Sequence, residues 1–283
     1  MKKISKAQSL NGPSPVVYIP LLLWTAFMIA MLVYIVGASL SIPVDVFTGK
    51  VFKYESGLHF ENYKTAWETQ SLYVYFFNSL IYAVTACCGT LLIGAPAAYI
   101  LSRCQFRGSA LIKRLLILVM SIPSILIVLP IYGLLVKLDI RGRIPLCIVY
   151  ICIRTPYTTV FLLNFFESIS KTYEEAAAID GCNDLKIFTN IALPMVRPAM
   201  TTITLFNFLN VLNEYFIALL LTASDGATSL GVGLTSVVSA LMYNSNYPAI
   251  YAAVVIVVLP SILIYCFTSR KIMYGGMGGG IKG

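Results

Sequence analysis

The stretch EAAAIDGCNDLKIFTNIALP, residues 175–194, predicts two short helical pieces joined at a glycine. Alanines and glutamates favour a helix over Tyr173–Asp180, and the acidic residues lie near its N-terminus, where the helix dipole favours them. Gly181 is expected to stop or bend this helix. A second piece, Asp184–Ala192, has an apolar face and is expected to end at Pro194. Taken alone, the pattern leaves two interpretations open: a rigid element that docks a partner, or an amphipathic helix on a membrane surface.

Long apolar segments surround this stretch and place most of the chain in a bilayer. Of the 283 residues, 58% are hydrophobic and only 11% are charged, whereas an average soluble domain has roughly 25% charged residues. Runs of more than about 18 nearly uncharged residues predict membrane-spanning helices. The six expected spans are Val16–Leu40, Tyr73–Leu101, Leu111–Val136, Ile144–Phe166, Ala199–Leu221 and Pro248–Phe267. The first is longer than the apolar core of a signal peptide, so we expect it to be retained.

The distribution of Lys and Arg predicts the orientation of the spans. With the N-terminus inside, thirteen of these residues fall on the cytoplasmic side and six on the other, with Arg154 left in a span. Cytoplasmic loops carry such an excess, and anionic lipid attracts it, so the net charge of +8 does not point to nucleic acid. The expected organisation is a cytoplasmic N-terminus (1–15), a first transmembrane helix (16–40), an external segment (41–72), a five-helix core (73–268) with a cytoplasmic loop (167–198), and a cytoplasmic glycine-rich tail (269–283).

Catalytic and metal-binding patterns are not found in the sequence. The seven cysteines show no C-x-x-C spacing and His59 is the only histidine, so no metal site is expected. An intramembrane enzyme would need a nucleophile and base or a metal cluster within the spans. A secondary transporter would show inverted repeats or mid-membrane carboxylates, of which Glu214 is the one candidate. The chain also has no G-x-x-x-x-G-K-[ST] phosphate loop, so we expect no nucleotide site and no cofactor in it.

Spacing in residues 175–194 then separates the two interpretations. The order Glu175-Ala176-Ala177, Gly181, Ile191-x-Leu193-Pro194 fits the signature E-A-A-x3-G-x9-I-x-L-P. Further matching segments are Asn78-Ser79, Ala97-Ala98-Tyr99-Ile100-Leu101-Ser102-Arg103, Asn213-Glu214-Tyr215 and a glycine-rich tail ending in Lys282-Gly283. On these residues the chain resembles bacterial ABC importer permeases of the carbohydrate-uptake branch, in particular the maltose-type G permeases.

The resemblance implies an all-α, type I importer permease fold with about six transmembrane helices in a bacterial cytoplasmic membrane, both termini inside. It implies a second homologous permease, two cytoplasmic ATPase subunits, an external solute-binding protein and a sugar substrate, with an oligosaccharide expected. The ATPase subunits would bind ATP and Mg, and their ATP-driven closure would drive alternating access through the loop 174–194. The coupling residues implied are Glu174, Glu175, Ala176, Ala177, Asp180, Gly181, Ile191, Leu193 and Pro194. The alternatives are import of another solute, such as glycerol phosphate, and a secondary transporter.

Polar side chains within the expected spans suggest a substrate path. Thr204, Asn207, Asn210 and Glu214 are spaced by three, three and four residues, which places them on one side of a helix. Intramembrane polar groups usually face a cavity or the bundle interior. The candidates are Asn207, Asn210, Glu214, Tyr215, Asn164 and Arg154. The alternative is hydrogen bonding between helices without any ligand. A phosphate ester would favour several cations in the path, and a single arginine in the spans therefore favours a sugar.

Overall fold

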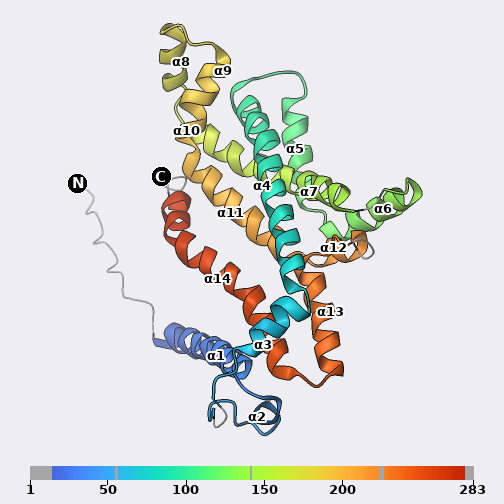
Figure 1. Cartoon of the computed structure of the whole chain (residues 1–283). Helices are drawn as coiled ribbons and strands as arrows, with labels where there is room; N and C mark the ends of the chain where they lie inside the picture. Colours follow the sequence, from blue (N-terminus) through green and yellow to red (C-terminus); the bar gives the residue numbers. More distant parts are fainter. Residues whose placement is uncertain (1–14, 55–56, 141, 223–225, 278–283) are drawn as a thin grey trace, which may run out of the picture.

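The computed structural model describes residues 15–54, 57–140, 142–222 and 226–277, and every regular element in these ranges is helical (Figure 1). The elements are α1 (Pro15–Ser39), α2 (Pro43–Phe47), α3 (Glu61–Lys64), the π-helical turn η1 (Thr65–Thr69), α4 (Leu72–Arg103), α5 (Ser109–Met120), α6 (Ser124–Lys137), α7 (Arg143–Ser168), α8 (Thr172–Ile179), α9 (Asp184–Ile187), the π-helical turn η2 (Phe188–Ala192), α10 (Leu193–Met195), α11 (Arg197–Leu212), α12 (Phe216–Leu221), α13 (Leu230–Tyr243) and α14 (Tyr247–Met277).

Four single helices of the described ranges are long and apolar enough to cross a membrane: α1, α4, α7 and α14. They correspond to the expected first, second, fourth and sixth spans. The third expected span, Leu111–Val136, is not one straight helix, because α5 and α6 meet at an angle of 95°. Pro123 stands directly before α6. Since proline disfavours helical backbone at the residue before it and has no N–H to donate, the helix is interrupted at this point.

The fifth expected span, Ala199–Leu221, is also interrupted. Helix α11 ends at Leu212 and the short α12 begins at Phe216. An apolar helix that the sequence did not suggest, α13, follows with 14 residues. Its length lies below the roughly 20 residues that a span requires, which is why a search for long apolar runs passes over it.

The core of the molecule forms where α4 and α7 lie side by side and α11 packs against both. Close approach depends on small residues of α4. A Cβ added to Gly94 would lie 3.1 Å from Thr158 Cγ2 and 3.3 Å from Thr159 Oγ1 of α7. Large side chains fill the space on either side, and Tyr82, Tyr150 and Phe166 are almost completely buried. Small residues in membrane helices allow such contacts between backbones, so this pair forms a rigid centre for the bundle.

The first helix lies at the edge of the bundle. Helix α1 packs on α14, where the rings of Tyr34 and Tyr251 meet edge to face with centroids 6.0 Å apart, while its side chains from Tyr18 to Val33 are exposed. The segment expected outside, 41–72, folds against the C-terminal end of α1. The Asn62 side chain donates to the carbonyls of Ser39 and Ser41, both at 3.0 Å.

Both chain ends lie partly outside the described residues. The expected cytoplasmic N-terminus, 1–15, falls there except for Pro15, and so does Lys282-Gly283. The expected glycine-rich tail, 269–283, begins as helix instead, because α14 continues to Met277.

Candidate functional site

The predicted bend at Gly181 is present and has a defined geometry. Helix α8 ends as the amide of Cys182 donates to the carbonyl of Ala177 (3.0 Å) and the amide of Gly181 donates to that of Ala178 (3.1 Å). This double closure requires a left-handed residue, and Gly181 has a φ of +83°. Asn183 then caps α9 by accepting a hydrogen bond from the Lys186 amide at 2.9 Å. The two helical pieces are therefore joined by a specific turn.

The second piece extends further than predicted. Helical backbone continues from α9 through η2 to α10, so the prediction that Pro194 ends the helix is wrong. Pro194 lies in the first turn of α10, directly after the wide turn η2. Local π geometry accommodates a proline because the helical hydrogen-bond pattern is already shifted there. Ala192 is buried and Leu193 half-buried, and α11 begins two residues after α10. The bent segment thus leads directly into the bundle.

The ends of α8 and α9 that flank this turn lie at one end of the molecule (Figure 1) and carry exposed apolar side chains. Ile179 is 87% exposed and Leu185 69% exposed. Ala176 and Ala178 are exposed as well, whereas Ala177 is buried. Large apolar side chains grouped with small ones on a surface typically mark a site of protein contact. We call the exposed residues Glu175, Ala176, Ala178, Ile179 and Leu185 the turn surface.

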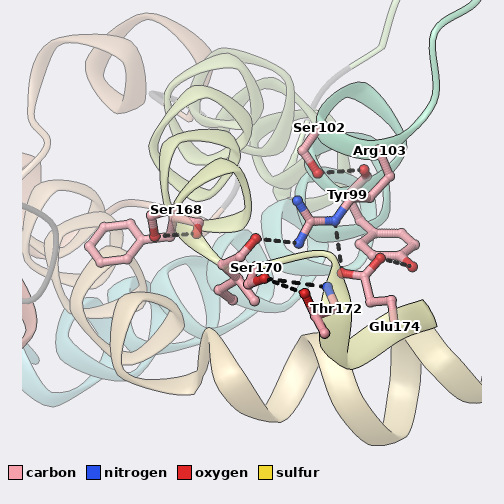
Figure 2. A network of polar contacts seen from close by, with 9 residues as sticks. Tyr99, Ser102, Arg103, Ser168, Ser170, Thr172 and Glu174 are labelled. Atoms are coloured by element: carbon pink, nitrogen blue, oxygen red, sulfur yellow. Dashed lines mark hydrogen bonds and ion pairs between the residues drawn. The ribbon is translucent and has the colours of Figure 1, made fainter. Parts of the chain in front are cut away.

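The adjacent carboxylates of α8 lie in different environments. Glu175 is exposed and belongs to the turn surface. Glu174 faces the bundle, where its Oε1 accepts a hydrogen bond from Arg103 Nε at 2.8 Å and its Oε2 accepts one from the Tyr99 hydroxyl at 3.2 Å (Figure 2). The sequence grouped both glutamates as coupling residues and gave no role to Arg103 or Tyr99. Tyr99 and Arg103 both lie in the segment 97–103, whose sequence resembles that of the permease family. That resemblance is the signal in the sequence that could have indicated them.

Asn207, one of the polar candidates in the spans, is satisfied by other helices. Its side-chain amide donates to Thr158 Oγ1 of α7 at 2.8 Å and to Thr90 Oγ1 of α4 at 3.4 Å. The residue is 1% exposed. In this structure it therefore connects the three helices of the core, and contact with a substrate stays a prediction.

Glu214 accounts for the interruption between α11 and α12. Its Oε1 accepts a hydrogen bond from the Ile217 amide at 2.7 Å and its Oε2 accepts one from the Ala218 amide at 3.0 Å. The same Oε2 accepts a third bond, from the Tyr150 hydroxyl of α7 at 2.7 Å. A carboxylate at this position satisfies amides that lack a partner at the start of α12 and attaches the break to α7.

The remaining candidates are more exposed than Asn207. Asn210 is exposed and its amide donates to the carbonyl of Phe206 at 2.8 Å. Tyr215 is 39% exposed and Asn164 is exposed. Arg154 is half-buried and lines a cavity of about 190 Å³ together with Tyr157 and residues at the α5–α6 bend. The structure thus brings Glu214 to α7 but does not gather all six candidates into one pocket.

Among the described residues, no group of three or more His, Cys, Asp or Glu side chains lies close enough together to hold a metal ion.

Comparison with known proteins identifies the family. Residues 90–270 match the family described as the binding-protein-dependent transport system inner membrane component. The chain belongs to this family. The matched range includes the turn surface, Glu174, all of α7 and α11, and the part of α4 from Thr90 onward. The permease is therefore a multi-pass transport subunit of an ABC importer.

Individual relatives agree with this assignment. The permease is 32% identical to the diacetylchitobiose uptake system permease protein NgcG of Streptomyces coelicolor, over 89% of this chain and 83% of that protein. It is 27% identical to the arabinooligosaccharides transport system permease protein AraQ of Bacillus subtilis, over 80% of each chain.

A solved structure confirms the fold. A chain of a bacterial ABC transporter involved in the import of the acidic polysaccharide alginate superimposes with a TM-score of 0.76 at 25% identity, covering 93% of this permease and 99% of that chain. The expected type I permease fold is confirmed.

Proposed function

We propose that this permease is one of two membrane subunits of an ATP-driven oligosaccharide importer and receives its motion through the turn surface. The observation that carries the proposal is a turn fixed by Gly181, with exposed Ile179 and Leu185 on the helix ends that flank it, that leads without a flexible linker into α11. The sequence contains no phosphate loop of its own, so a partner must bind ATP and Mg.

In this proposal the turn surface docks on a cytoplasmic ATPase subunit. Ile179 and Leu185 would enter an apolar cleft, and the small side chains of Ala176 and Ala178 would allow close approach of the backbone. The shape of the segment 174–194 would be held by its other coupling residues, which are Ala177, Asp180, Gly181, Ile191, Leu193 and Pro194. Closure of two ATPase subunits would then rotate the spans between inward-facing and outward-facing states as rigid bodies. Both termini would lie in the cytoplasm.

The other partners follow from surfaces that the chain leaves uncovered. Apolar side chains along α1 and α6 are exposed in the isolated chain, which supports contacts with lipid and with a second, homologous permease. A periplasmic or extracellular binding protein would meet the opposite end, where the segment 41–72 lies. A structure that shares the fold, at 17% identity and a TM-score of 0.57, shows a bacterial alginate ABC transporter in complex with an alginate pentasaccharide-bound periplasmic protein.

An oligosaccharide is the substrate class that the named relatives support. Asn210 and Tyr215 would offer an amide and an aromatic face to a polyhydroxylated ligand, with Asn164 as a further amide on α7. Arg154 and Tyr157, which line the cavity of about 190 Å³, favour as second candidate an anionic solute such as an acidic sugar or a phosphate ester. One arginine is a weaker feature than the several cations that a phosphate ester would favour, and a neutral oligosaccharide therefore comes first.

Copurification of the tagged full-length permease tests the assembly. The expected result is one second permease and two ATPase copies. Replacing Ile179 by aspartate should remove the ATPase copy that docks on this permease and leave the permease pair intact, because it introduces a charge into the apolar contact. Tyr243→Asp is the matched control, since Tyr243 is 90% exposed on α13 at the other end of the molecule. A lone oligomer that transports without ATP would refute the proposal.

Uptake measurements test the substrate. Vesicles containing the assembled importer and its binding protein should accumulate a neutral oligosaccharide, with diacetylchitobiose and arabino-oligosaccharides as the first probes. An alginate oligosaccharide and glycerol phosphate serve as the anionic probes. Preference for an anionic probe that disappears with Arg154→Gln would favour the second candidate instead.

A further inference from the structure

We infer that Arg103 and Glu174 form a positioning pair, which fixes α8 to the end of α4 so that the turn surface and α4 move together as one body. The inference rests on the proposed coupling role of the turn surface. Docking of an ATPase does not by itself specify how motion reaches the spans. The Arg103–Glu174 pair is the contact that passes the motion from α8 to α4.

The pair joins three parts of the chain at one guanidinium group. Arg103 is the last residue of α4, and its Nε donates to Glu174 Oε1 of α8 at 2.8 Å. Its Nη2 donates to the carbonyl of Ile169 at 3.2 Å, in the short connection between α7 and α8 (Figure 2). A planar group with several fixed donors suits such a junction better than a flexible ammonium.

Burial distinguishes this contact from an ordinary surface ion pair. The side chains of Arg103 and Glu174 are only 9% and 13% exposed. The neighbouring pair between Lys113 and Glu167 is shorter still, at 2.6 Å, but its side chains are 32% and 45% exposed. Exposed pairs contribute little because water competes for both charges, whereas removing one partner of a buried pair leaves the other charge uncompensated.

Tyr99 extends the attachment to the second helical piece. Its hydroxyl donates to Glu174, and its ring packs against Phe166 of α7 and Phe188 of η2 with centroid distances of 5.5 and 5.0 Å. The last turn of α4 thus contacts both helical pieces of the segment 174–194: α8, which precedes Gly181, and η2, which follows it. Displacement of α8 alone would break the ion pair and the hydroxyl contact together.

Hydrogen exchange measured by mass spectrometry on the full-length permease tests this inference. Arg103→Gln should raise exchange of the α8 amides about tenfold, which corresponds to about 1.4 kcal/mol of local stability. Lys113→Gln, in the exposed pair, should leave α8 exchange at the wild-type level. The exchanged pair Arg103→Glu with Glu174→Arg should restore protection, since the charges again match. Unchanged α8 exchange in Arg103→Gln would overturn the inference.

The assembled importer supplies a second measurement that a merely structural contact would not affect. In the wild type, trapping with MgATP and vanadate should change exchange in α8 and in the last turn of α4 together. In Arg103→Gln the ATPase subunits should still copurify and the α4 response should be lost. If trapping still changed hydrogen exchange in the last turn of α4 of Arg103→Gln, the Arg103–Glu174 pair would not be the link between α8 and α4. Failure of the wild type to bind ATPase subunits would refute the proposed function instead, while the exchange of α8 in the isolated permease still tests the pair.

Discussion

Replacing Gly181 by alanine should weaken ATPase docking about five- to thirtyfold. Gly181 adopts a φ of +83°, and an added Cβ would meet nothing within 4 Å. The cost is therefore conformational rather than steric, and an L-residue in the left-handed region loses about 1–2 kcal/mol. A loss of that size corresponds to roughly a factor of 5–30 in an equilibrium. The equilibrium affected here is between two forms of the turn. In one its hydrogen bonds are formed and the segment can dock, and in the other they are broken.

Asparagine is the matched control at the same position. Asn tolerates the left-handed conformation better than other residues with a side chain, and it serves as the second choice at such helix ends. Gly181→Asn should therefore bind the ATPase within a few-fold of the wild type. Binding of purified ATPase to the permease in nanodiscs, followed by thermophoresis, gives the three dissociation constants under identical conditions.

The relative ATPase affinities of Gly181→Asn and Gly181→Ala show why position 181 needs a glycine. If Gly181→Asn binds as weakly as Gly181→Ala, or more weakly, the left-handed backbone is not the reason for glycine. The glycine would then be required because the ATPase leaves no room for a side chain. Wild-type affinity for Gly181→Ala would refute both explanations.

Three further predictions concern the core. Gly94→Val should destabilise the detergent-solubilised permease by about 1–3 kcal/mol, because added methyl groups meet the stiff side chain of Thr158; an unchanged thermal unfolding curve would contradict the close α4–α7 packing. Asn207→Leu should cost about 1 kcal/mol in the same measurement, since interhelical hydrogen bonds in membranes contribute about 0.6 kcal/mol each; loss of uptake at full stability would instead place Asn207 in the substrate path. Glu214→Gln should cost about 1–3 kcal/mol, because one amide oxygen cannot serve all three donors, and limited proteolysis should then cut first near 213–216; full protection there would contradict the capping role.

The sequence predicted the apolar spans well where they are continuous helices. Length and hydropathy are additive properties of a segment, so α4 and α7 could be located to within a few residues. The bend before α6 and the break after α11 could not, since both depend on where individual hydrogen bonds go. Pro123 is visible in the sequence, but prolines at 96, 156 and 260 lie inside helices that continue. The role of Glu214 required knowledge that Tyr150 lies opposite.

The segment 174–194 likewise has one feature that the sequence predicted and one that it did not. The glycine bend was predictable because few residues adopt a left-handed backbone, and the structure contains it. Which of two neighbouring glutamates faces outward was not predictable from the short helix itself. Glu174 faces inward because Arg103, seventy-one residues earlier, lies beside it. Long-range electrostatic pairing of this kind carries no local pattern.

The packing of α1 on α14 has a consequence for biosynthesis. The long helix on which the first described helix packs is the last one, and the side chains of α1 from Tyr18 to Val33 are exposed. Since membrane helices are made in order from the N-terminus, α1 must remain in the bilayer without that partner until more than two hundred later residues have been translated. Insertion of this helix and its assembly with the bundle are thus separate events in time, and chaperones or neighbouring subunits can reach α1 during the interval.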